Sequence, residues 1–207
     1  MIIVVTGGIG SGKSAVCGIL SAEYDIPVYE ADRKVKELYG KYPSLVLSIE
    51  DSLEMSLRDE QGRFVPSQLA DRIFTDRDAL EKVESLVFPL LMQDFCRWME
   101  EHAEAGHHVF ESATILEKPY FDGFGDLVVL VDAPLSLRIR RAAERDGADI
   151  DAVKRRSSNQ ALMNLLSQGV ADERIGYVIN NDSDIGSLHL KVDEFARKHI
   201  LNKNVSY

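Results

Sequence analysis

The sequence has no long apolar stretch, no excess of basic residues and only two cysteines among its 207 residues. No apolar run approaches the ~20 residues of a membrane-spanning helix. The apolar start at residues 2–5 is too short for the core of a secretory signal and has no basic leader. The formal net charge of -10 disfavours general nucleic-acid binding, which needs a basic surface. We therefore expect a cytoplasmic protein that binds neither membranes nor nucleic acids, as a monomer or small homo-oligomer.

The two cysteines, Cys17 and Cys96, lack the spacing of metal ligands. We expect both to be buried free thiols, which suits an intracellular protein. With 45% hydrophobic and 28% charged residues, the chain has the composition of a globular domain with a sizeable core.

Short apolar segments alternate with helix-like stretches along the chain. The segments are almost continuously apolar, which is typical of strands buried on both faces of a parallel sheet. They are residues 2–6, 26–29, 108–112, 127–132 and 176–179. The helical stretches are residues 13–23, 66–105 (two or more helices, with Asp76 as an N-cap and Pro89 as a break or kink), 135–145, 149–167 and 184–199. This alternation predicts an α/β fold with a doubly wound, five-stranded parallel sheet and right-handed crossovers.

Two helical insertions are longer than a simple crossover requires. They suggest one domain over residues 1–207, with a core, a helical substrate subdomain and a lid. The core is assigned to residues 1–32, 106–137 and 168–207, the substrate subdomain to 33–105, and the lid to 138–167. Ligands of such sheets bind at the carboxyl ends of the strands, near which both insertions leave or re-enter the sheet.

Four of the 14 glycines lie in one loop, residues 7–14, which reads GGIGSGKS. The spacing matches G-x-x-x-x-G-K-[ST], a phosphate-binding loop, and an apolar strand precedes it while a helical pattern follows. Glycines let successive N–H groups turn toward one anion, the lysine reaches the β- and γ-phosphates, and the Ser hydroxyl is offered to Mg²⁺. The dinucleotide pattern G-x-G-x-x-G fails, because its last position, counted from Gly8, is Lys13. The nucleotide-binding residues expected here are Gly8, Ile9, Gly10, Ser11, Gly12, Lys13 and Ser14, of which Ser14 is also the metal ligand.

Two further features allow alternative interpretations. Seven basic residues between 138 and 156 form either an anion site or a solvated helix face paired with Glu144, Asp146 and Asp149, and composition favours the second. Asp32 follows the second strand, where its carboxylate either accepts the proton of an attacking hydroxyl or caps a helix over residues 33–39.

The rest of the chain indicates which class of nucleoside-triphosphate-binding protein this is. It has no Asn-Lys-x-Asp motif of a GTPase and no convincing strand ending in Asp-Glu, as large ATPases have. A short chain with two helical insertions favours a kinase of small molecules with an arginine-bearing lid. The alternatives are a kinase of another nucleotide or metabolite, and an ATP-dependent binding or regulatory module.

The motifs together resemble the dephospho-CoA kinase family over nearly the whole chain. The resemblance rests on TGGIGSGKS at 6–14, IPVYEAD at 26–32, the helical segment at 69–91, VFESATILE at 109–117, the segment at 127–147 and YVINND at 177–182. It implies transfer of the γ-phosphoryl group of ATP to the 3′-hydroxyl group of dephospho-CoA, with Mg²⁺ as the cofactor, on a sheet of the P-loop kinase type.

The resemblance also implies roles for individual residues. Asp32 becomes the favoured base, and Arg141 and Arg155 the lid arginines that act on the phosphates. Asn181 falls where the loop after the last strand borders the adenine.

The chain departs from the family pattern at several positions. Ala15 replaces a hydroxyl residue, so one α-phosphate contact is expected to be lost, although the residue stays in the nucleotide site. Glu30 stands in place of an Asp, and Phe88 precedes Pro89 in place of a His. Glu111 either holds a water bound to magnesium or pairs with a nearby base.

Overall fold

The computed structural model describes residues 1–201, which form two compact units. One unit joins Met1–Glu30 to the chain from His102 onward, and the other is Ala31–Glu101. The first unit contains the β-sheet and the phosphate-binding loop, and the second contains four helices.

The sheet of the first unit has five parallel strands in the order β2-β3-β1-β4-β5. The strands are β1 (Ile2–Thr6), β2 (Val28–Glu30), β3 (His108–Glu111), β4 (Leu127–Asp132) and β5 (Ile175–Asn180). The predicted doubly wound parallel sheet is therefore confirmed, with strand ends that differ by one or two residues. Because β1 lies between β3 and β4, the loop after β1 leaves the sheet at the switch point, where ligands of such sheets bind.

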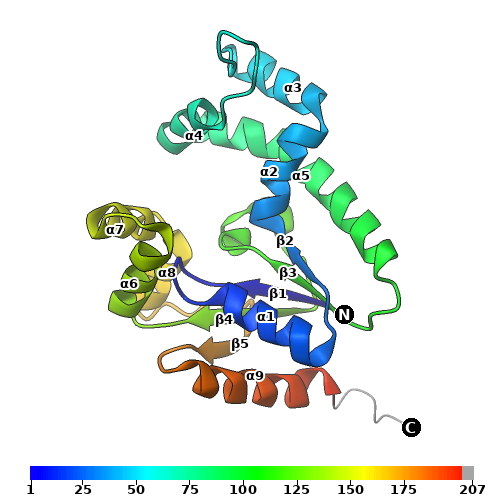
Figure 1. Cartoon of the computed structure of the whole chain (residues 1–207), viewed down its shortest axis with the longest axis vertical. Coiled ribbons are helices and arrows are strands. Elements are labelled where there is room, and N and C mark those ends of the chain that lie inside the picture. The colour runs from blue at the N-terminus through cyan, green and yellow to red at the C-terminus, as the bar shows by residue number, and fades with distance from the viewer. Residues whose placement is uncertain (202–207) are drawn as a thin grey trace. The chain divides into compact units, whose positions relative to one another are not determined.

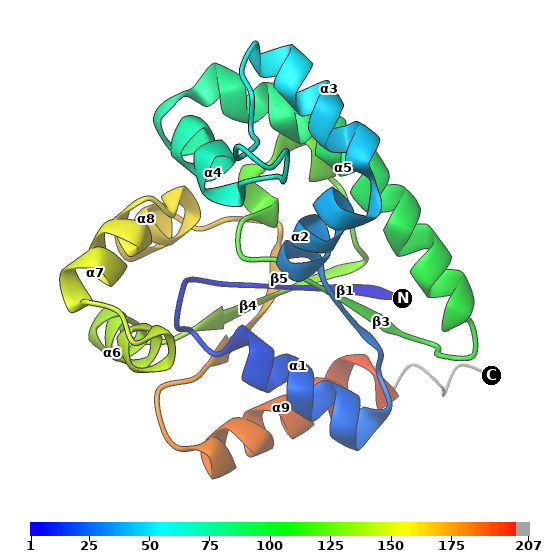
Figure 2. The same cartoon turned by 45° about the horizontal axis from the view of Figure 1, so that its top comes forward.

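Two helices cover one face of this sheet. Helix α1 (Lys13–Tyr24) and helix α9 (Ile185–His199) lie side by side across the strands (Figures 1 and 2). Buried apolar side chains of both helices pack against inward-facing residues of the strands; among them are Val5, Val129, Leu20, Val192 and Phe195. This core fixes the first turn of α1, and with it the loop that precedes the helix.

Three further helices gather beyond the arrowheads of β4 and β5 (Figure 1). They are α6 (Leu135–Asp146), α7 (Ile150–Ser158) and α8 (Ala161–Ser167). The single helical stretch expected over residues 149–167 is therefore wrong, because Gln160 adopts an extended backbone conformation between α7 and α8. Two 3-10 turns, η1 (Ile115–Glu117) and η2 (Pro119–Phe121), follow β3.

The second unit contains α2 (Ala31–Lys41), α3 (Pro43–Leu53), α4 (Pro66–Thr75) and α5 (Arg77–Glu101). Asp76 caps α5 as predicted, because its Oδ1 accepts a hydrogen bond of 3.0 Å from the Ala79 N–H. Pro89 lies inside α5 and does not break it, and α3 was not anticipated. Helix α2 begins at Ala31, so Asp32 lies in its first turn and not before a helix over residues 33–39.

Only one of the two cysteines is buried. Cys17 lies on the buried side of α1, as expected, whereas Cys96 is exposed on α5, so the expectation for Cys96 is wrong. Within residues 1–201, no helix combines the length and the apolar character needed to cross a membrane.

Candidate functional site

The loop between β1 and α1 has the backbone of a phosphate-binding loop. Gly7, Gly10 and Gly12 adopt positive φ angles of 147°, 72° and 98°, which side chains resist. The Ser11 N–H donates to the Gly8 carbonyl at 3.1 Å, which closes the loop, and α1 starts directly after Gly12. The loop therefore joins a buried strand to a helix N-terminus, the arrangement that presents N–H groups to an anion.

Lys13 folds back over this loop. Its Nζ atom donates to the carbonyl oxygens of Gly7 at 3.0 Å and Gly8 at 3.4 Å. The ammonium group is thus held at the end of the loop nearest β1. Because this lysine contacts the β- and γ-phosphates in phosphate-binding loops, we expect the terminal phosphate of a bound nucleotide at that end. Ser14 is exposed and Ala15 half-buried in the first turn of α1, toward the other end.

The conformation of Gly10 leads to a stability prediction. A Cβ atom at this position would collide with the main-chain oxygen of Arg138 and would require a side chain at φ 72°. We expect Gly10→Ala to lower the free energy of unfolding by about 2 kcal/mol, because backbone strain of this kind costs of order 1–3 kcal/mol. Urea unfolding followed by circular dichroism measures the change.

Gly18 provides the matched control in the adjoining helix. It lies inside α1, and no atom lies within 4 Å of the place that a Cβ atom would take, so Gly18→Ala is expected to raise the free energy of unfolding by about 0.5–1 kcal/mol. Equal unfolding midpoints for Gly10→Ala and the unmodified protein would contradict the strained geometry of the loop.

The loop after β5 lies against the phosphate-binding loop. Asn181 is buried, and its Nδ2 atom donates to the Ser11 carbonyl at 2.8 Å. A Cβ atom at Gly12 would collide with the same Nδ2 atom, so the two loops approach too closely for any larger residue there. The residue expected at the adenine is therefore in direct contact with the phosphate-binding loop.

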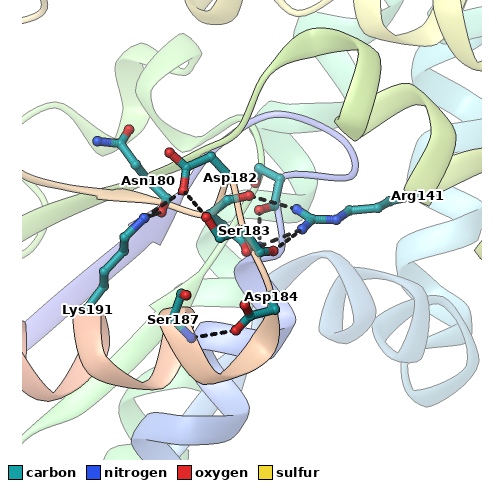
Figure 3. Close-up of polar contacts among 9 residues, drawn as sticks. Arg141, Asn180, Asp182, Ser183, Asp184, Ser187 and Lys191 are labelled. Carbon is teal, nitrogen blue, oxygen red and sulfur yellow. Dashed lines mark hydrogen bonds and ion pairs between the residues drawn. The ribbon is translucent and has the colours of Figure 1, made fainter.

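Two cations from different helices hold this second loop (Figure 3). From α6, the Arg141 guanidinium group donates to the carbonyl oxygens of Asn181 at 2.9 Å and Ser183 at 3.3 Å. From α9, Lys191 Nζ donates to the Asn180 carbonyl at 2.6 Å and to Asp182 Oδ1 at 2.7 Å. Arg141 is thus linked to the phosphate-binding loop through Asn181.

The basic cluster at residues 138–156 divides into three groups. Four of its members form exposed ion pairs, as a solvated face predicts: Arg140 with Glu144, Arg145 and Arg156 with Asp146, and Lys154 with Asp151. Asp149, expected among the partners, instead accepts hydrogen bonds from two N–H groups at the start of α7. Arg155 is exposed on α7, and within residues 1–201 its side chain forms no ion pair. Arg141 and Arg138 turn inward.

Sequence reasoning missed two residues that contact the phosphate-binding loop. Gln160 is buried, and its Oε1 atom accepts a hydrogen bond of 2.8 Å from the Ile9 N–H. Arg138, 5% exposed, packs its guanidinium group against Gly8, where a Cβ atom would collide with Nη1. Both residues come from the segment expected to be a lid, and only a long-range contact identifies them.

Two carboxylates lie at the carboxyl ends of neighbouring strands. The register of the sheet places Glu111 opposite both Val5 of β1 and Glu30 of β2. Burial and the charge of Glu111 raise the pKa of the Cys17 thiol, with Glu30 adding to the effect and Lys13 opposing it. The two carboxylates therefore act electrostatically on the first turns of α1, which carry Ser14.

The carboxylate oxygens of Glu30 and Glu111 and the Ser14 hydroxyl group are of the chemical kind that binds Mg²⁺. Magnesium keeps several waters and is held by one or two protein oxygens plus substrate phosphates, so a dedicated cage of protein ligands is not required. In the described part of the chain, no group of three His, Cys, Asp or Glu side chains could hold a metal ion. An exposed Ser14 hydroxyl beside a phosphate-binding loop fits such a site.

Comparisons with known proteins agree on one family. The family model described as dephospho-CoA kinase matches residues 1–186. The dephospho-CoA kinase of Porphyromonas gingivalis is 36% identical over 171 residues, 83% of each chain. That of Chlorobaculum tepidum is 31% identical over 199 residues, 94% of this chain and 92% of the relative.

Solved structures agree with the fold. TT1252 from Thermus thermophilus superposes with a TM-score of 0.76 at 27% identity, covering 100% of this chain and 98% of the other. The dephospho-CoA kinase from Campylobacter jejuni gives a TM-score of 0.64 at 17% identity, covering 98% of both chains.

Proposed function

The chain belongs to the dephospho-CoA kinase family, and from this premise we propose how its residues transfer the γ-phosphoryl group of ATP to the 3′-hydroxyl group of dephospho-CoA. The product is coenzyme A. The observation that carries the proposal is the glycine loop at residues 7–14, with the Lys13 ammonium group held over its first two carbonyl groups.

The loop binds the phosphates of ATP. Loop N–H groups other than those of Ile9, Ser11 and Ala15, which donate to oxygens of the protein, bind the phosphate oxygens. Lys13 exchanges its carbonyl partners for the β- and γ-phosphates. Asn181 supports this geometry, because its hydrogen bond to the Ser11 carbonyl fixes one side of the loop. Its proximity to the adenine follows from the family pattern.

Ser14 would hold Mg²⁺, together with phosphate oxygens and water, and the ion would supply positive charge to the phosphates there. Glu111, buried at the end of β3, orients water on that side of the site.

Asp32 orients the ribose hydroxyl and accepts its proton. In a loose transition state the bond to the attacking oxygen is little formed, so orientation contributes at least as much as proton removal. Arg141 and Arg155 stabilise charge on the transferring group. The guanidinium group of Arg141, tied to the loop after β5, is already linked to the phosphate-binding loop through Asn181. Arg155, exposed on α7, approaches the phosphates when that helix moves.

Acceptor binding is assigned to the helical residues 33–105, and residues 138–167 act as the lid. The compact helical unit Ala31–Glu101 supports the first assignment. The hydrogen bond between Gln160 and Ile9 supports the second, because it joins a residue of the proposed lid to the phosphate-binding loop.

The proposal is tested by incubating the protein with ATP and Mg²⁺, with and without dephospho-CoA. We expect ADP only when dephospho-CoA is present, and mass spectrometry should find the acceptor heavier by one phosphoryl group. ADP formed equally without the acceptor would indicate an ATPase or a nucleotide-controlled module. Transfer to other nucleosides or metabolites, but not to dephospho-CoA, would indicate another kinase.

A further inference from the structure

Arg138 differs from the other basic residues of its cluster because its charged group is buried. The side chain is 5% exposed, and its Nε and Nη1 atoms are buried without a hydrogen-bond partner. By contrast, the neighbouring Arg140 is exposed and pairs with Glu144 at 4.0 Å. Buried polar groups are almost always paired, so an exception requires an explanation.

Arg138 has little charge compensation from the protein. A guanidinium group remains protonated even when burial lowers its pKa, as it does here, with the charge of Asp132 opposing the shift. Arg138 forms no ion pair with Asp132 or with any other carboxylate within residues 1–201. A buried charge without a partner is costly, and removal of that charge is often stabilising.

The guanidinium group lies against the phosphate-binding loop. A Cβ atom at Gly8 would collide with Arg138 Nη1, and a Cβ atom at Gly10 would collide with the main-chain oxygen of Arg138. Gly8 is also the residue whose carbonyl accepts from Lys13 at 3.4 Å, at the end of the loop that faces the terminal phosphate. Two cations therefore flank Gly8.

Other partnerless buried atoms lie at the same place. Thr6 Oγ1, directly before the loop, and Ser11 Oγ, within it, are buried without hydrogen-bond partners. Unsatisfied polar groups concentrated at one loop indicate that the missing partner is a polar ligand and not a defect of packing.

We propose that Arg138 is a further phosphate-binding residue, whose buried guanidinium group supplies counter-charge for the terminal phosphate of the bound nucleoside triphosphate. This inference rests on the proposed binding of ATP, and it adds a second cation at Gly8 to that of Lys13. The charge is unfavourable in the free protein and is compensated when the triphosphate binds. Arg138 therefore increases the affinity for ATP more than the affinity for ADP.

Arg138→Met tests this, with Arg140→Met as the control on the same helix. Methionine keeps a long side chain beside Gly8, near which Met163 Cγ also lies, but removes the charge. We expect the melting temperature of the nucleotide-free variant to equal or exceed that of the unmodified protein. Isothermal titration with Mg²⁺ should show ATP bound at least tenfold more weakly, ADP less than threefold more weakly, and both unchanged in Arg140→Met.

The opposite pattern would overturn the proposal. If Arg138 only braced the loop, the nucleotide-free variant would melt at a lower temperature and lose ATP and ADP affinity equally. Arg138→Gln, also uncharged but able to form hydrogen bonds, gives a second measurement of the ATP-to-ADP ratio should Arg138→Met fail to fold. An unchanged ratio in the glutamine variant would also overturn it. Because no titration contains dephospho-CoA, an error about the acceptor leaves these results unaffected.

Discussion

Replacing Lys13 by alanine is expected to lower the turnover of dephospho-CoA by about 100-fold or more, the usual loss when one preorganised group that stabilises developing charge is removed. The Lys13 ammonium group is held at 3.0 Å from the Gly7 carbonyl, over the loop that binds the phosphates. Without it, the terminal phosphate loses the cation that neutralises charge as the bond to the leaving group breaks. A coupled assay of ADP release measures the change.

Lys198→Ala is the matched control for this experiment. Lys198 is an exposed lysine on α9 whose ammonium group lies 5.5 Å from the centre of the Tyr177 ring. Its replacement is expected to leave turnover within twofold of the unmodified protein. Full turnover in Lys13→Ala would remove the loop from the mechanism and with it the main support for the proposed function.

The features that the sequence predicted well are local. A strand, a glycine loop and a helix start fall within residues 2–24, and the residue types there are dictated by short-range geometry: buried apolar residues, glycines at positive φ, and Lys13 one residue beyond. The parallel sheet was also predictable, because strands buried on both faces have a continuous apolar pattern that leaves few alternatives.

The contacts that complete the site are not local. The hydrogen bond from Asn181 to Ser11 spans 170 positions, and that from Ile9 to Gln160 spans 151. Nothing in the residues near Gln160 distinguishes a side chain that accepts from a loop N–H from one that faces solvent. Arg138 is equally hard to identify from the sequence, because there it is one of seven basic residues and only its burial distinguishes it from the others.

Errors in the predicted helices have physical causes of the same kind. Helix α7 stops before Gln160, whose backbone is extended and whose side chain accepts from Ile9, so a tertiary contact coincides with the break in the helical pattern. Pro89 was expected to break or kink a helix, and it does not break α5, which continues through it between buried Val87 and Leu91. Burial on both sides of a proline outweighs its cost to the helix.

Replacing Asp32 by asparagine is expected to reduce kcat by about 100-fold or more while the affinity for ATP stays within twofold, because general-base catalysis typically contributes 10²–10⁴-fold. Asp32 lies in the first turn of α2, two residues after β2 ends, outside the loop that holds the phosphates. Asparagine keeps the shape and can orient a hydroxyl group but cannot take its proton. Steady-state kinetics with dephospho-CoA and separate ATP titrations measure the two quantities.

The size of this effect distinguishes proton removal from orientation. In a loose transition state the hydroxyl proton leaves late. If Asp32 only oriented the acceptor, its substitution would mainly raise KM for dephospho-CoA, and asparagine would retain much of the function. A fall in kcat without a change in KM would instead identify Asp32 as the base. Glu194→Gln, at an exposed position on α9 and outside residues 33–105, is the control and should change neither quantity. A wild-type rate in Asp32→Asn would leave the carboxylate only a structural role in the first turn of α2.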